Sequence, residues 1–291
     1  MAIKESWVFA DWGIPRLSDI SMAAELGFTD IVFGVVDGVV YKDGKAAYGI
    51  YEPYKSSYGY ENVFLHAKNL GMNTHAMAFI YRKRKYLGDC LNMLEYAARL
   101  KPHSVLLNIE GPGLRGNAVS KEEYLNFIDR LFLGLDGLGV ALGSVVIPPY
   151  PKLLYPMLGY FDYVILEAYS FWSKNNTRLW SHTDKMFPGQ FQKKVIADFG
   201  KCSEEIFGST PKEYIRNKLI VGFANYELDR PATMVRPAVS QKENVRLCIE
   251  AVDSADIPSI AVWSLKNFRG NSAQRKEIRE LFRSVNKTIE R

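Results

Sequence analysis

Short apolar runs recur along the chain, and each is followed by a longer stretch with an amphipathic pattern. The runs are rich in Val, Ile, Leu and Phe and nearly continuous, which is typical of strands buried on both faces of a parallel sheet. They predict strands at residues 7–11, 30–36, 73–80, 104–110, 140–147, 162–168, 218–224 and 259–264.

The stretches between these runs carry helix signals. Gly27 stands where a helix would end, and the pairs Ser120 with Glu123 and Ser240 with Glu243 have the spacing of capping boxes. The pattern predicts helices at residues 18–26, 60–70, 88–100, 120–135, 191–206, 210–217 and 240–254.

The alternation of strands and helices decides the fold class. Eight strands alternating with helices in 291 residues are typical of an α/β protein with a single (β/α)₈ TIM barrel, here one catalytic domain over residues 1–291. The alternative is a doubly wound open sheet. Dinucleotide-binding sheets of that kind have a glycine-rich turn after the first strand, whereas this chain has Asp11-Trp12-Gly13-Ile14-Pro15 there. We therefore expect the barrel.

Composition narrows the classes of protein and partner. Hydrophobic residues (47%) and charged residues (24%) indicate an ordinary globular chain. A net charge of +5 suits an anionic polymer or a cell envelope, but it is too scattered to predict nucleic-acid binding. No apolar window predicts a membrane span, and the N-terminus lacks the pattern of a signal peptide. We expect synthesis in the cytoplasm, with a separate route of release for any action on the cell wall.

Metal and cofactor motifs are absent from the sequence. Cys90, Cys202 and Cys248 lie far apart and predict buried thiols without disulfides. The four histidines lack metal-ligand spacing, and His75 in a predicted strand is expected to be a core histidine. No P-loop, Rossmann fingerprint or nucleophile elbow is found. The sequence therefore predicts no metal and no cofactor, and we expect a monomer.

Polar and aromatic residues end several of the predicted strands. The active site of a TIM barrel lies at the carboxyl ends of its strands. Asn108 and Glu110 lie two residues apart near one such end, so both would face the barrel interior. A carboxyl group among apolar and aromatic side chains has a raised pKa, which suits Glu110 for general acid catalysis; the alternative is a structural carboxylate. The other strand-end candidates are Asp11, Trp12, Glu167, Tyr169, Asn225, Tyr226, Glu227 and Trp263.

Four segments resemble strand-end motifs of glycoside hydrolase barrels that cleave N-acetylhexosamine polymers. Residues 106–110 are similar to the strand-four motif, in which Asp or Asn stands two residues before the catalytic Glu. Residues 167–169, 218–226 and 261–265 are similar to the motifs of strands six, seven and eight. The resemblance is to chitinases of family 18 and endo-β-N-acetylglucosaminidases of families 18 and 85. A weaker similarity, carried by an early Asp and the strand-four Glu, is to the muramidases of family 25.

The resemblance implies a substrate-assisted, retaining hydrolysis of β-linked N-acetylhexosamine polysaccharide, such as peptidoglycan, a chitin-like polymer or an N-glycan. Glu110 would protonate the leaving oxygen, and Asn108 would orient the 2-acetamido group that attacks the anomeric carbon. Tyr169 would stabilise the oxazoline-like intermediate, and Trp263 would stack beneath the sugar ring. Such a mechanism is an exception to the two-carboxylate scheme.

The chain departs from the chitinase pattern at three positions. His103, Leu106 and Asn108 stand where that pattern has acidic residues, although an Asn at position 108 is what family 85 uses. This departure keeps open an alternative of another class, a catalytically inactive chitinase-like barrel that binds carbohydrate.

Two other mechanisms also remain open. In a two-carboxylate, muramidase-type lysin, Glu110 would pair with Glu167, Glu227 or Asp11, and the separation of the carboxyl groups would set the stereochemical outcome. In a barrel that acts on a phosphorylated metabolite, the basic residues 82–85 would meet the ligand, and a phosphate site would lie near strands seven and eight.

Aromatic residues also follow the sixth predicted strand. Trp172 lies there in a segment that interleaves aromatic and polar residues, which suits contact with the faces of sugar rings. We expect Trp172 to join Asp11, Trp12, Tyr226 and Glu227 in binding the polysaccharide partner.

Overall fold

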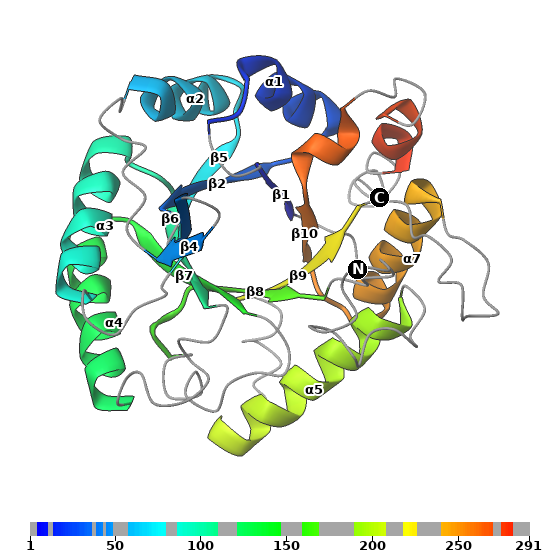
Figure 1. Ribbon diagram of the computed structural model, residues 1–291. Coiled ribbons are helices and arrows are strands. Elements are labelled where there is room, and N and C mark those ends of the chain that lie inside the picture. The colour runs from blue at the N-terminus through cyan, green and yellow to red at the C-terminus, as the bar shows by residue number, and fades with distance from the viewer. Residues whose placement is uncertain are drawn as a thin grey trace.

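The structure, a computed structural model, shows a closed parallel barrel surrounded by helices (Figure 1). It describes residues 5–10, 14–36, 39–42, 45–48, 58–79, 86–109, 121–146, 159–168, 189–207, 218–225, 240–269 and 275–281. The barrel strands follow one another around the wall in chain order, and the first pairs with the last. They are β1 (Glu5–Phe9), β2 (Asp30–Val36), β5 (Asn73–Phe79), β6 (Ser104–Ile109), β7 (Ala141–Val146), β8 (Tyr163–Glu167), β9 (Leu219–Ala224) and β10 (Ser259–Trp263).

The helices pack on the outside of this barrel. They are α1 (Leu17–Leu26), α2 (Tyr58–Asn69), α3 (Tyr86–Leu100), α4 (Lys121–Asp136), α5 (Gln190–Phe207) and α7 (Gln241–Ser254), with a 3₁₀ turn, η3 (Leu265–Phe268), after β10. The predicted (β/α)₈ TIM barrel is confirmed, and every predicted strand matches a barrel strand to within two residues at both ends. The helix predicted at 210–217 lies outside the described residues. None of the described helices is both long and apolar enough to cross a membrane.

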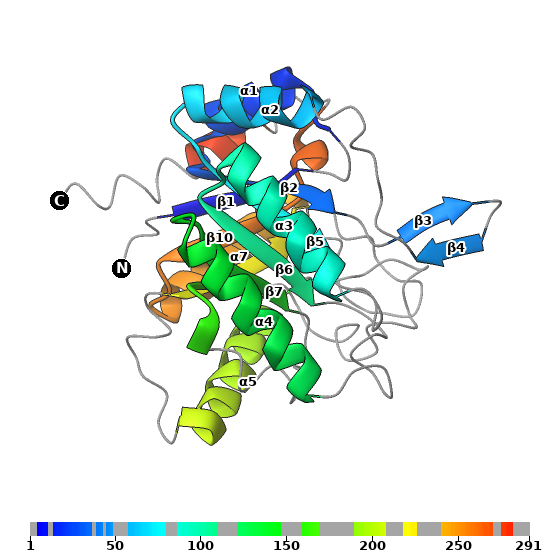
Figure 2. The same ribbon diagram turned by 90° about the vertical axis from the view of Figure 1, so that its left-hand side faces the viewer.

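One hairpin was not predicted. Between β2 and α2 the chain forms β3 (Val39–Lys42) and β4 (Lys45–Tyr48), which pair antiparallel in a sheet of their own. Figure 2 shows the hairpin standing beyond the carboxyl ends of β2, β5 and β6. The sequence between its strands is Asp-Gly, a dipeptide strongly favoured in two-residue hairpin turns, so a signal was present.

Alternate residues of each strand face inward, because successive strand side chains point to opposite sides. Large apolar side chains fill the barrel interior: Trp7, Phe9, Val32, Met77, Leu106, Val145, Ile165, Ile220 and Ala261. The alternate positions pack against the helices, as Leu107, Val164 and Val221 do. The interior is therefore a packed core, and only the ends of the barrel can present polar groups.

Gly143, on β7, is required by this packing. A Cβ atom added there would lie 2.5 Å from Leu106 Cδ2 and 3.1 Å from the Tyr163 carbonyl oxygen. We expect Gly143→Ala to lower the free energy of unfolding by about 1–3 kcal/mol, because backbone and core side chain would both have to shift. Chemical denaturation measures the change. Gly200→Ala in α5 is the control, since a Cβ there meets nothing within 4 Å, and an equal loss in both variants would contradict the steric cause.

The amino-terminal end of the barrel is closed by a buried polar cluster around His75. His75 Nε2 lies 2.9 Å from Asp30 Oδ1, and His75 Nδ1 lies 2.7 Å from Ser104 Oγ. The Thr29 hydroxyl donates to the other Asp30 oxygen at 2.6 Å. The Trp7 ring stacks on the imidazole with 3.9 Å between centroids. The expectation of a satisfied core histidine is confirmed.

Burial makes the stability of the fold depend on pH through His75. Burial lowers the pKa of His75 below its ordinary 6.5, while the hydrogen bond to Asp30 acts in the opposite direction. As the pH falls below about 6.5, the unfolded chain takes up a proton that the folded chain resists. We therefore expect the free energy of unfolding to fall from pH 7 to pH 5, by at most about 1.4 kcal/mol per pH unit from this group.

Urea denaturation at several pH values checks this dependence. In a His75→Gln variant the part of the slope that belongs to this group should vanish. A slope unchanged by that substitution would show that another group causes the acid sensitivity.

Two predicted helix starts differ in detail from the structure. α1 begins after Arg16, whose backbone N–H donates to Asp19 Oδ2 at 3.2 Å, so the helix starts one residue before the predicted position 18. At α7 the Ser240 hydroxyl accepts from the Glu243 N–H at 3.2 Å, as a cap should. The Glu243 carboxylate binds Arg246 at 2.6 and 2.8 Å, because a cation one turn along the helix is within its reach.

Candidate active site

Three of the predicted site residues lie inward at the carboxyl end of the barrel. Asn108 is two residues after Leu106, and Glu167 is two residues after Ile165, so each shares the inward direction of a core side chain. Trp263 packs directly against the interior core. The structure thus brings an amide, a carboxyl group and an indole from β6, β8 and β10 to the same end.

Burial distinguishes the two polar groups from ordinary surface residues. Asn108 is 1% exposed and Glu167 is 2% exposed. Buried polar side chains of this kind make strong, well-oriented hydrogen bonds, because the surroundings have a low dielectric. An amide and a carboxyl group buried in such surroundings can bind and orient a polar ligand that enters from the mouth.

Trp263 is held by the neighbouring first strand. Its backbone pairs with Phe9 of β1, and the two rings lie 5.3 Å apart at an angle of 51°. The peptide bond between Trp263 and Ser264 is cis. The indole remains partly exposed while Ser264 is fully buried, so the ring can offer a face to a ligand above the core.

Amide side chains from the helices hold the carboxyl ends of β8 and β9. Gln192 Nε2, on α5, donates to the Ala168 carbonyl at 2.6 Å, one residue after Glu167. Asn244 Nδ2, on α7, donates to the Ala224 carbonyl at 2.7 Å. Both amides are buried. They supply hydrogen-bond partners for backbone carbonyls at the ends of the two strands, and so they fix the strand ends.

A second amide network ties β9 to β10. The Asn225 N–H donates to the Trp263 carbonyl at 3.0 Å, and Asn225 Oδ1 accepts from Asn267 Nδ2 at 3.0 Å. Gln241 Nε2 donates to the backbone carbonyls of Asn225, at 2.5 Å, and Asn267, at 3.0 Å. The backbone that carries Trp263 is therefore braced from the helix layer.

The amides on the helices were not identified from the sequence. Gln192, Gln241 and Asn244 all stand in the first turn of a helix, the turn nearest the carboxyl ends of the strands. The signal that the sequence offered for these residues was an amide side chain at the start of each of the two helices. Of the predicted residues, Asp11, Trp12, Glu110, Tyr169, Trp172, Tyr226 and Glu227 lie outside the described residues, as do the basic residues 82–85.

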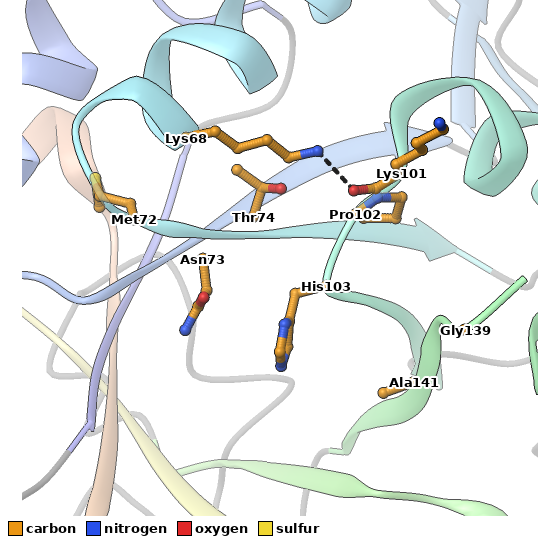
Figure 3. Close-up of a pocket in the computed structure, with 9 residues that line it drawn as sticks. All are labelled: Lys68, Met72, Asn73, Thr74, Lys101, Pro102, His103, Gly139 and Ala141. Carbon is orange, nitrogen blue, oxygen red and sulfur yellow. Dashed lines mark hydrogen bonds between the residues drawn. The ribbon is translucent and has the colours of Figure 1, made fainter.

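A hollow of about 360 Å³ lies at the other end of the barrel, beside the starts of β5, β6 and β7 (Figure 3). Lys68 Nζ donates there to the carbonyls of Leu100, at 3.1 Å, and Lys101, at 2.6 Å, and so binds the last carbonyls of α3. Burial and the nearby Lys101 charge lower the pKa of Lys68. Features at this end of a TIM barrel serve stability, so we do not place the site here.

Metal and thiol chemistry find no support in the described residues. Within them, no three His, Cys, Asp or Glu side chains gather closely enough to hold a metal ion. Cys90 and Cys248 are free and buried, as predicted, and burial raises the pKa of both thiols. A buried thiol with a raised pKa is a poor nucleophile.

No protein-family model matches this chain, and no curated protein matches it in sequence. Solved structures with the same fold include several chitinases. The C-terminal domain of a putative chitinase from Desulfitobacterium hafniense has a TM-score of 0.65 at 11% identity, covering 99% of both chains. The Group IV chitinase of Ostrinia furnacalis, in complex with allosamidin, has a TM-score of 0.63 at 12% identity, covering 98% of this chain and 99% of its own.

The spore cortex-lytic enzyme SleL of Bacillus megaterium is a further structural neighbour. Its TM-score is 0.59 at 10% identity, over 97% of this chain and 73% of that one. The chain therefore has the TIM-barrel fold of chitinase-like glycoside hydrolases, as the strand-end motifs predicted.

Proposed function

We propose that this protein is a glycoside hydrolase that cleaves β-linked N-acetylhexosamine polysaccharide at the carboxyl end of its barrel. The observation that carries the proposal is the position of Asn108, Glu167 and Trp263, which were selected from sequence motifs and which all occur at that end. The fold is shared with chitinases, whose name gives chitin as the substrate, and with an enzyme named for the lysis of the spore cortex.

In the proposed mechanism the substrate supplies the nucleophile. Glu110 donates a proton to the leaving glycosidic oxygen, and the 2-acetamido oxygen of the substrate attacks the anomeric carbon. Asn108 holds the acetamido group by hydrogen bonding, and Tyr169 stabilises the oxazoline-like intermediate. Water then opens the intermediate with Glu110 as base, so the configuration is retained. Trp263 forms the floor of the sugar site.

Glu167 has a defined part in the competing mechanism. In a two-carboxylate lysin it would act as nucleophile or base opposite Glu110. Separations of about 5–5.5 Å between carboxyl groups imply retention, and about 6.5–9.5 Å imply inversion. An inverted product would therefore exclude the substrate-assisted mechanism and favour the two-carboxylate mechanism.

The phosphorylated-metabolite alternative gains no support from the amide donors of Gln241 and Asn267. Barrels that bind phosphate use the loops after strands seven and eight together with a short extra helix. In this chain the short helix η3 follows β10, the eighth barrel strand, and its Asn267 is bound to Asn225 and Gln241. The amide donors of Asn267 and Gln241 are therefore engaged within the protein, whereas Asn225 Nδ2 is buried without a partner among the described residues.

Reducing-end release from three polymers tests the proposal: purified peptidoglycan, chito-oligosaccharides and a high-mannose glycopeptide. Release from one of them would support a hydrolase and identify its substrate, and release from peptidoglycan would extend the proposal to action on the cell wall. The anomeric form of the first product is read by NMR: the substrate-assisted route predicts retention, and an inverted product would exclude that route. Binding to a polymer without any release would overturn the hydrolase and favour an inactive, carbohydrate-binding barrel.

A further inference from the structure

The hollow at the amino end of the barrel has a basic lining. Lys68, on α2, and Lys101, directly after α3, both line it, and none of the described residues in the lining is an Asp or a Glu. Burial and the Lys101 charge together lower the pKa of Lys68, so the two ammonium groups are close enough to repel each other. An anion bound beside both would relieve this repulsion.

A buried hydroxyl group in the same lining lacks a partner. Thr74, the second residue of β5, is 1% exposed, and its Oγ1 atom makes no hydrogen bond with any described residue. Figure 3 shows its side chain on the same side of β5 as those of Lys68 and Lys101, with the hydroxyl turned toward the end of the Lys68 side chain. A buried donor without a partner is costly, so a ligand oxygen that accepts from Thr74 would bind favourably there.

Lys68 also has a donor left for a ligand. Its Nζ donates to the carbonyls of Leu100, at 3.1 Å, and Lys101, at 2.6 Å. An ammonium group carries three N–H donors, so one is not used by these described partners. The hollow therefore joins a fixed ammonium group to the Thr74 hydroxyl.

The helix ends around the hollow do not favour a cation. The last carbonyls of a helix attract positive charge. Those that end α2 accept from the backbone N–H groups of residues 70–72, and those that end α3 accept from Lys68 Nζ. With these acceptors engaged and two ammonium groups present, the hollow suits an anion.

Lys101 stands where a glycine is usual. It follows the last residue of α3 with a φ of +46°, a conformation that strains residues with a Cβ atom. The turns after α1 and α2 place Gly27 and Gly71 at positive φ, as helix ends commonly do. A charged side chain at the strained position is explained if its ammonium group binds a ligand.

We propose that the hollow binds a phosphate dianion, as the free ion or as the monoester of a small metabolite, through Lys68, Lys101 and the Thr74 hydroxyl. Phosphate presents its oxygens in a tetrahedron, so it can accept from donors on two helix ends and a strand at once, and lysine is a common phosphate ligand. The hollow measures about 360 Å³ against about 30 Å³ for one water molecule, which leaves room for the carrier of a monoester. This site lies at the end of the barrel opposite the proposed active site, and it does not depend on hydrolysis.

Calorimetry with inorganic phosphate, glucose 6-phosphate and glucose tests the site on the full chain. We expect both phosphates to bind and glucose not to bind. Tighter binding of glucose 6-phosphate would support the site and assign it to a monoester, and equal binding of the two phosphates would support it and assign it to the free ion.

Three substitutions test the assigned residues. Lys68→Met, Lys101→Gly and Thr74→Val should each weaken phosphate binding about tenfold, the effect of losing one charge-assisted hydrogen bond. The matched control is Lys201→Met, at an exposed position of α5, which should bind as wild type does.

Urea denaturation separates a binding role from a structural one. Lys101→Gly should be at least as stable as wild type because it relieves the positive φ, and Thr74→Val because the hydroxyl that it removes is buried without a described partner. Weak binding by these stable variants would support the site, since misfolding could not explain it. Binding that survives all three substitutions, glucose that binds as tightly as its phosphate, or no binding of either phosphate at about 10 mM would overturn the proposal.

Discussion

Glu110→Gln should lower the rate of glycosidic hydrolysis about 10³-fold. The substitution keeps the size of the side chain and removes the proton that the leaving oxygen requires, and general acid catalysis contributes about 10²–10⁴-fold. Substrate binding should persist, because the amide still forms hydrogen bonds. Initial rates of reducing-end release measure hydrolysis, and calorimetry measures binding of the polymer that the wild type cleaves. Both are measured on one protein preparation.

The matched control is Glu122→Gln. Glu122 is an exposed residue of α4, so the same chemical change is made away from the barrel mouth. Its rate should equal that of wild type. Turnover that survives Glu110→Gln would show that the acid is another residue, and Glu167 and Glu227 would then be tested by the same substitution.

His75→Ala should cost the fold about 3–5 kcal/mol of unfolding free energy. The imidazole is completely buried and is bonded to Asp30 and Ser104, and Trp7 stacks on it. Its removal leaves a cavity and takes a partner from a buried carboxylate, and each of these effects alone is costly. Urea unfolding, followed by tryptophan fluorescence and by circular dichroism, measures the loss.

His66→Ala is the comparison for this variant. His66 is a partly exposed residue of α2, and its imidazole Nε2 lies 2.9 Å from Ser21 Oγ. We expect a loss of less than about 1 kcal/mol there, because water can replace the lost partner. Similar losses of unfolding free energy in the two variants would show that burial is not the reason why His75 stabilises the fold.

The barrel could be predicted because its pattern is local. Each strand is a short apolar run, and each helix has its own periodicity and end signals, so elements could be placed without knowledge of their neighbours. The unpredicted hairpin has a different origin. Val39–Lys42 and Lys45–Tyr48 pair with each other over only four residues and without a long apolar run, so only their Asp-Gly turn indicates them.

Site residues could be predicted only where the alternation of side chains along a strand determines which of them face inward. Asn108, Glu167 and Trp263 face inward because each is an even number of residues from a core position. The contact between Gln192 and Ala168 joins residues 24 positions apart, and that between Gln241 and Asn267 joins residues 26 apart. Such pairs form only after helices dock on the barrel, so no local pattern shows them.

The pairing of β1 with β10 has a consequence for the order in which the chain is made. Glu5–Phe9 leaves the ribosome first, but its partner Ser259–Trp263 is synthesised more than two hundred residues later. Until then the nascent sheet has two open edges, each able to pair with another chain. A chain that stops just before position 259 would therefore lack β10 and keep an open sheet with two unpaired edges. We expect this truncated protein to aggregate.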